Sequence, residues 1–188
     1  MIHIVTIGGS ARSGNYTAKA LALVQRELRN HEDVVVTEID PATLKLAIPG
    51  STMDSSDRDW LTETVASADG VILATPEYHG TFSSLMKLVI ENLGFPSALA
   101  KKPVALLGVA SGRIGAIKSL EHLRSVCSHV GALVLPNPVS VARVRAVLRR
   151  ARGNVESSGV VRIGNLAVDL ANRNVIVAGE PVSLTPTE

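Results

Sequence analysis

Three polar loops, each following an apolar run of the chain, have residue types suited to a planar ligand with a phosphate. They are GGSARSGNYT (residues 8–17), TPEYHGTFSS (residues 75–84) and ASGRIG (residues 110–115). Their glycines allow close backbone approach, and their hydroxyl and amide side chains supply hydrogen-bond donors. If the preceding runs are strands of one parallel sheet, the three loops meet at its carboxyl edge, where open α/β sheets bind ligands.

The first loop has the composition of an anion site at the start of a helix. Glycines at positions 8, 9 and 14 let the backbone approach a ligand, and the following helix offers free N–H groups and a positive dipole end. The candidate binding residues are Ser10, Arg12, Asn15, Tyr16 and Thr17. The loop contains neither a Walker A motif nor GxGxxG. A tight turn with a helix cap is the alternative interpretation.

The second and third loops have the character of a site for a flat heteroaromatic ring. The second combines an aromatic side chain with proline and glycine, which fix the backbone and expose N–H groups. Its candidate residues are Pro76, Glu77, Tyr78, His79 and Gly80. The candidates of the third loop are Ser111, Gly112 and Arg113.

Apolar runs and helical patterns alternate along the chain, and they predict the elements that position these loops. Strands are expected at residues 2–7, 33–40, 70–76, 103–110 and 132–136. Helices are expected at residues 17–30, 57–68, 83–93 and 115–130, with Trp60 on the apolar face of the second. Strands that are apolar on both sides belong in a parallel sheet covered by helices, so the pattern predicts an α/β fold.

The composition is that of a folded protein with an aliphatic core. The chain has 188 residues, of which 46% are hydrophobic and only 3% aromatic, and its net charge is +2. That charge is too small to indicate nucleic-acid binding by itself. Because Cys127 is the single cysteine, no intrachain disulfide is possible. With no signal peptide or bilayer-spanning run in the sequence, we expect a cytoplasmic protein without membrane partners.

The segments GSARSGNYTAKAL, TPEYHGTFSSLMKLVIENL and GVASGRIGAIKSLEHLR resemble three signatures of the NADPH-dependent FMN reductase family. The resemblance runs in order over about residues 1–140. It implies a flavodoxin-like, doubly wound sheet of five strands in the order 2-1-3-4-5. It also implies FMN, with its phosphate in the first loop and its ring against the second and third loops.

The resemblance implies a reaction in which the flavin carries the redox chemistry and the protein supplies binding and orientation. We therefore expect hydride transfer from NADPH or NADH to FMN, then ping-pong transfer to flavin, quinone or similar small-molecule acceptors. No protein side chain is predicted to be catalytic, and no metal site is expected. A flavodoxin-like electron carrier and a flavin-responsive regulatory protein are the alternatives. The resemblance also implies a homodimer or homotetramer.

Residues near the C-terminus depart from this pattern. Val141–Gly153 has one apolar stripe and predicts the last helix of a flavodoxin-like domain over residues 1–152. Residues 153–159 are expected to be a linker. Short alternating apolar runs over residues 160–188 predict an antiparallel β appendage.

The segment from residue 142 onward resembles the receiver end, linker and N-terminal sheet of a winged-helix response regulator. Thr185 has the pattern of a helix N-cap, but the sequence does not continue into a recognition helix, so DNA binding is not expected. A receiver also needs an acidic pair after its first strand, a phospho-acceptor Asp after its third and a Lys after its fifth. The chain has Gly8-Gly9, Pro76-Glu77 and Asn137-Pro138 at those places, which excludes a receiver over the whole chain.

Overall fold

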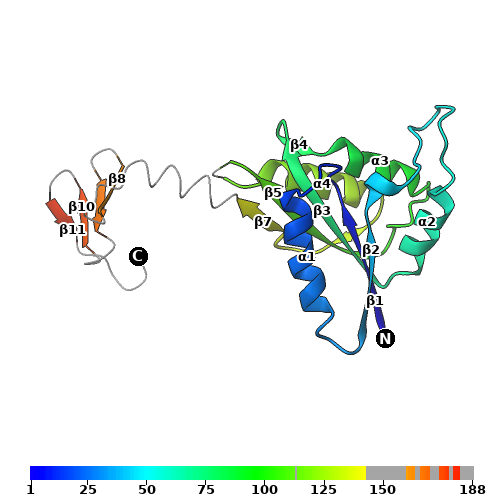
Figure 1. Cartoon of the computed structure of the whole chain (residues 1–188), viewed down its shortest axis with the longest axis horizontal. Coiled ribbons are helices and arrows are strands. Elements are labelled where there is room, and N and C mark those ends of the chain that lie inside the picture. Colours follow the sequence, from blue (N-terminus) through cyan, green and yellow to red (C-terminus); the bar gives the residue numbers. More distant parts are fainter. Residues whose placement is uncertain (113, 143–159, 164–165, 170–173, 178–179, 183–188) are drawn as a thin grey trace. The chain divides into compact units, whose positions relative to one another are not determined.

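A computed structural model describes residues 1–112 and 114–142, together with four short strands near the C-terminus (Figure 1). The chain divides into two compact units, Met1–Ala142 and Arg143–Glu188. Arg113, most of the expected last helix, the linker and the expected helix start at Thr185 lie outside the described residues.

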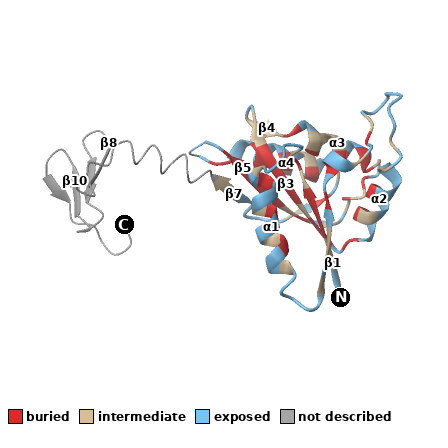
Figure 2. Ribbon diagram, viewed as in Figure 1, coloured by how far each residue is buried: buried red, intermediate tan, exposed pale blue. Residues whose placement is uncertain are grey.

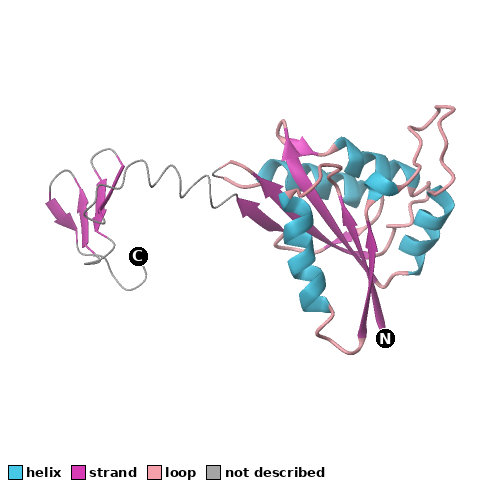
Figure 3. Ribbon diagram, in the orientation of Figure 1, coloured by secondary structure: helices cyan, strands magenta, loops and turns pink. Residues whose placement is uncertain are grey.

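The first unit contains a parallel sheet whose strand order is β2-β1-β3-β5-β6 (Figure 3). Its strands are β1 (Ile2–Gly8), β2 (Val34–Ile39), β3 (Gly70–Tyr78), β5 (Pro103–Ala110) and β6 (Leu133–Val134). In the register, Ile7 of β1 lies between Ile39 of β2 and Leu73 of β3. The expected α/β fold and its strand order are confirmed. The order reverses between β1 and β3, which places the first and second loops next to each other.

Helices cover both faces of this sheet (Figure 2). They are α1 (Tyr16–Leu28), α2 (Arg58–Ser67), α3 (Ser84–Asn92) and α4 (Ile117–His129), with a short 3-10 turn η1 (Pro41–Thr43). Buried residues of α2, α3 and α4 share one aliphatic cluster with Leu73. On the other face, Leu21 of α1 packs with Ala74 and Leu107. Leu73 and Ala74 are consecutive residues of β3, so they lie on opposite faces of the sheet and pack into two separate cores.

The last strand of the sheet differs from the expected continuous strand at 132–136. It is divided into β6 and β7 (Val139–Ala142), and both pair in parallel with β5. Pro136 and Pro138 lack the N–H group that a ladder needs, and Asn137 between them has φ 57°. Val141 lies in β7, so the expected helix does not begin at that residue.

Two further expectations are corrected. β3 does not end at Pro76 but continues to Tyr78, because its end pairs with β4 (Thr81–Phe82) in an antiparallel hairpin. Trp60, expected on the apolar face of α2, is 48% exposed, whereas Leu61 and Val65 are fully buried.

The second unit contains a four-stranded antiparallel sheet of order β11-β10-β9-β8. Its strands are β8 (Val160–Ile163), β9 (Leu166–Asp169), β10 (Asn174–Val177) and β11 (Glu180–Val182). Neighbouring strands pair in sequence order, as in a meander.

Candidate functional site

The first loop leaves β1 through a close backbone contact with β3. The Gly9 N–H donates to the Ala74 carbonyl at 2.7 Å. A Cβ at Gly9 would lie 2.9 Å from that carbonyl oxygen and 3.1 Å from Ser83 Oγ, so only glycine fits without a shift. The chain is therefore held against β3 where it turns toward α1, which is the geometry of a phosphate cradle.

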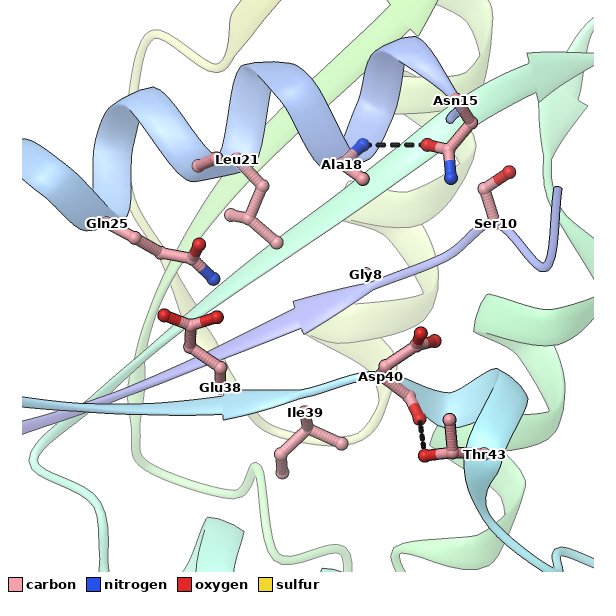
Figure 4. Close-up of a pocket in the computed structure, with 11 residues that line it drawn as sticks. Gly8, Ser10, Asn15, Ala18, Leu21, Gln25, Glu38, Ile39, Asp40 and Thr43 are labelled. Carbon is pink, nitrogen blue, oxygen red and sulfur yellow. Dashed lines mark hydrogen bonds between the residues drawn. The ribbon is translucent and has the colours of Figure 1, made fainter. Parts of the chain in front are cut away.

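Asn15 caps α1 and closes the first loop (Figure 4). Its Oδ1 accepts from the Ala18 N–H and its Nδ2 donates to the Arg12 carbonyl, both at 2.7 Å. The side chain of Asn15, predicted to bind phosphate, is thus occupied in shaping the loop. Thr17, also predicted to do so, is only 2% exposed, while Tyr16 lies at the surface with Lys19 over its ring.

The first and second loops meet at Tyr78. The Arg12 guanidinium lies 4.8 Å from the centre of the Tyr78 ring, a cation–π distance. The hydroxyl groups of Ser10 and Tyr78 lie 3.4 Å apart. Three residues that the sequence separates into two motifs are therefore brought together beside the end of β1.

The second loop is the tip of the β3–β4 hairpin. Tyr78 pairs with Thr81, and the two residues between them have positive φ, 51° for His79 and 78° for Gly80. This is the backbone of a two-residue type I′ turn. The His79 side chain is exposed at the tip.

Glu77 joins the second loop to the start of α4. Its Oε2 accepts from the Ser119 N–H at 3.1 Å, in the first turn of a helix whose N-cap, Ala116, has no side-chain hydrogen bond. A carboxylate there satisfies an open donor and faces the positive end of the helix dipole. Glu77, predicted to contact the cofactor, is therefore engaged in fixing the hairpin against the helix.

The third loop follows directly from β5, beside the hairpin. Ser111 and Gly112 are exposed, and a Cβ at Gly112 would meet no atom within 4 Å. The backbone therefore leaves open space for a ligand at this position. Arg113, the predicted cation of the loop, lies outside the described residues.

Ser83 is a structural part of the site that the sequence analysis did not select. Its Oγ donates to the Gly9 carbonyl and accepts from the Met86 N–H, and its own N–H donates to Thr75 Oγ1. It thus caps α3 while holding the first loop. Its place just before a helical run predicts the cap, but the contact with Gly9 spans 74 residues and has no local signal.

The side chains near the site show no ligand set for a metal. Within the described residues, no three His, Cys, Asp or Glu side chains are grouped closely enough to hold an ion. Cys127 is buried in α4, and desolvation by this burial raises the pKa of its thiol to about 12. None of the helices in the described part of the chain combines the length and apolarity needed to cross a bilayer.

Two features of the three loops fit a flavin mononucleotide. The glycine contact at residue 9 and the α1 N-terminus have a geometry that can hold a phosphate, and Arg12 is a cation of the same loop. Tyr78 ends β3, and the open backbone at Gly112 follows the neighbouring strand β5. Both features lie at the carboxyl edge of the parallel sheet, and the first loop lies where the strand order reverses between β1 and β3.

Known proteins resemble the chain over the same region. A NADPH azoreductase from Bacillus sp. (strain OY1-2) is 41% identical over 75 residues, which are 40% of this chain and 42% of that protein. An FMN-dependent NADPH-azoreductase from Staphylococcus haemolyticus is 28% identical over 141 residues, 71% of this chain and 73% of that protein. The alignments with the first curated relatives span 42%, 33% and 54% of those proteins.

A solved apo structure of the NADH:FMN oxidoreductase EMOB has the same fold. It matches with a TM-score of 0.66 and 22% sequence identity, over 84% of this chain and 81% of that one. The sequence model of the family described as NADPH-dependent FMN reductase matches residues 2–146, which include all three loops. The resemblance of the C-terminal segment to a response regulator lies almost entirely beyond this match and stays a prediction. The chain belongs to the NADPH-dependent FMN reductase family.

Proposed function

We propose that the protein is an FMN-dependent NAD(P)H oxidoreductase that passes electrons to flavin, quinone or similar acceptors. The observation that carries this proposal is the convergence of Ser10, Arg12 and Tyr78 at the strand-order reversal. It rests also on membership of the family.

The residues of the three loops have distinct roles in the proposed site. Ser10 and Arg12 hold the FMN phosphate together with N–H groups at the α1 N-terminus. Asn15 sets the loop by its two hydrogen bonds. Tyr78 flanks the ring, and Glu77 orients the hairpin through its bond to Ser119.

The remaining predicted residues line the edges of the proposed site. Gly80 and Gly112 keep the backbone close to the ring, and the remaining proposed contacts are Tyr16, Thr17, Pro76, His79, Ser111 and Arg113. When bound, the flavin supplies the hydride and electron chemistry. The N–H groups of the second and third loops would stabilise negative charge at the polar edge of the ring.

The test measures FMN affinity by quenching of flavin fluorescence. Arg12→Ala removes a charged hydrogen bond to phosphate and should raise the dissociation constant about tenfold or more. Arg26→Ala removes another exposed arginine, in the last turn of α1, and should leave the affinity unchanged. Equal affinities of all three proteins would overturn the proposed phosphate site.

The rate of flavin reduction separates the enzyme from the alternative electron carrier. An oxidoreductase of this type bleaches within seconds of adding NADH or NADPH and reoxidises with a quinone in a ping-pong pattern. A carrier would retain FMN but bleach slowly. The sequence pI near 8.9 and the low aromatic content differ from the acidic flavodoxins.

We further propose a homodimer or homotetramer located in the cytoplasm. Phe95, 92% exposed just after α3, is an apolar side chain that a subunit contact would cover. Sedimentation analysis of the full chain would give the mass of the assembly.

For the C-terminal unit, the regulatory alternative is tested by a duplex DNA shift at physiological salt. We expect no shift, because the net charge of +2 is too small to indicate nucleic-acid binding. A specific shift would favour the flavin-responsive regulator.

A further inference from the structure

The β3–β4 hairpin, whose tip is the second loop, contacts both the first loop and the helix α4 (Figure 1). Toward the first loop, Tyr78 lies beside Ser10 and Arg12. Its other contact is with the first and second turns of α4, the helix that follows the third loop. The hairpin is therefore the element through which the three loops are held relative to one another.

Two side-chain hydrogen bonds join the hairpin to α4. From β3, Glu77 Oε2 accepts from the Ser119 N–H at 3.1 Å. From β4, Thr81 Oγ1 lies 3.1 Å from His122 Nδ1, one turn further along the helix. The Thr81 hydroxyl can donate to this nitrogen or accept from it, according to the imidazole tautomer. Because the bonds come from both strands of the hairpin, they fix its position along the helix.

The bond to His122 lies next to the hairpin tip. Thr81 directly follows Gly80, the second residue of the type I′ turn. The stem of Lys118 also lies close to the tip, since a Cβ at Gly80 would be 3.8 Å from Lys118 Cδ. His122 and Lys118 therefore reach the part of the second loop whose backbone N–H groups are proposed to approach the flavin.

The start of α4 is in turn fixed on the sheet. A Cβ at Gly108 of β5 would lie 2.7 Å from the Ala116 Cβ and equally close to Leu120 Cγ, so the helix rests directly on that strand. From β7, Ser140 Oγ accepts from the Ala116 N–H at 2.8 Å. The helix, and with it the end of the third loop, is thus held by two strands. A hairpin bonded to α4 keeps a fixed place relative to that loop.

We propose that His122 is a positioning residue for the flavin ring, because through Thr81 it holds the second loop in place beside the third. This inference rests on the proposed function, which assigns the ring to these two loops. A tip that is already ordered loses less conformational entropy when a rigid ring binds, so its N–H groups bind more tightly. Arg12 acts on the phosphate instead, and the two contributions can therefore be measured apart.

The probes are FMN and riboflavin, which share the ring but differ in the phosphate. Each is titrated into the full chain and followed by quenching of its fluorescence. His122→Ala should raise both dissociation constants by the same factor, about threefold to tenfold, which corresponds to the loss of one hydrogen bond. Arg12→Ala should raise the dissociation constant of FMN far more than that of riboflavin, because its proposed partner is the phosphate.

Conservative variants separate the hydrogen bond from the mere presence of a side chain. His122→Asn places an amide where Nδ1 lies and should restore the affinity of the parent for both flavins. The longer side chain of His122→Gln carries its amide nearer to the position of Nε2, so this variant should resemble His122→Ala. The matched control is His129→Ala, which removes another exposed histidine at the end of the same helix and should bind as the parent does.

Thr81→Val tests whether His122 acts through its hydrogen-bond partner. It keeps the branched shape that suits a strand and removes only the hydroxyl. It should weaken both flavins as His122→Ala does, and the double variant should lose no more than either single one, because both remove the same bond. Urea unfolding measures the stability of each variant separately.

Three results would overturn the proposal. They are unchanged dissociation constants in His122→Ala, a loss for FMN without a loss for riboflavin, and additive losses in the double variant. A lower stability with unchanged affinities would assign the bond a structural role alone. If the parent binds neither flavin, the proposed function fails as well, whereas binding by the parent that His122→Ala leaves unchanged overturns only the role of His122.

Discussion

Single residues decide how closely the first loop approaches the sheet, and Gly9 is the clearest case. Gly9→Ala places a methyl group 2.9 Å from a backbone oxygen of β3, which cannot move as a side chain can. We expect a loss of about 1–3 kcal/mol in the free energy of unfolding, measured with urea, together with weaker FMN binding.

Gly112→Ala is the matched control for that substitution. No atom lies within 4 Å of the added Cβ, so the free energy of unfolding should change by less than about 0.5 kcal/mol. Equal losses in the two variants would show that the close approach at residue 9 does not limit stability.

The thiol of Cys127 gives a second prediction at this scale. Its pKa is raised from 9.0 to about 12 by burial, so the folded protein keeps the thiol neutral where the unfolded chain ionises. This contribution to stability is fully present below pH 9 and is lost as the pH rises from 9 to 12. The expected slope is about 1.4 kcal/mol per pH unit between those values.

Urea unfolding of the parent and of Cys127→Ala at several pH values isolates this effect. The difference between their slopes above pH 9 removes the contributions of tyrosine and lysine, which both proteins share. Parallel slopes would contradict the effect of burial. An aromatic disulfide reagent at pH 8 should also react with the parent only after unfolding.

At the scale of elements, Ser83 links the start of α3 to the first loop. Ser83→Ala removes the cap on the Met86 N–H and the bond to the Gly9 carbonyl. We expect a loss of about 1–2 kcal/mol in the free energy of unfolding and a weaker affinity for FMN. Ser84→Ala, at the exposed neighbouring position, should change neither quantity. Unchanged FMN affinity in Ser83→Ala would show that the first loop holds its shape without the hydrogen bonds of the Ser83 hydroxyl.

The elements could be predicted where periodicity is regular. The strands at β1, β2 and β5 and the four helices follow from apolar runs and helical spacing, whereas the strand order was implied by the resemblance to the family. The hairpin beyond Pro76 could not be predicted, because His79-Gly80 is a rare type I′ sequence and β4 has only two residues. The break between β6 and β7 was signalled by two prolines, yet proline alone does not tell where pairing resumes.

The candidate site could likewise be predicted in part from the sequence. The loops that approach one another follow from the parallel topology, so Ser10, Arg12 and Tyr78 could be placed near one edge in advance. The bond of Asn15 to the Ala18 N–H is local and agrees with the alternative interpretation of a turn with a helix cap. The bond of Glu77 to the Ser119 N–H spans 42 residues and could not be predicted.

At the scale of the whole molecule, every described residue of the proposed site belongs to the unit Met1–Ala142. A chain ending at residue 159, before β8, should therefore bind FMN within about twofold of the full chain, because no proposed contact lies in the β8–β11 sheet. Fluorescence titration of both proteins checks this. A large loss in the shortened chain would indicate that the C-terminal sheet takes part in the site.

The hydrogen bond between Ser83 and the Gly9 carbonyl also limits how freely the first loop can be replaced. One hydroxyl bonds a helix N–H and a distant backbone carbonyl at the same time, so exchanging Ser83 alone leaves both groups without this partner. A laboratory that transplants the first loop from a relative should carry the matching residue at position 83 with it. Homologous recombination between relatives should succeed more often when the crossover keeps both positions from one parent.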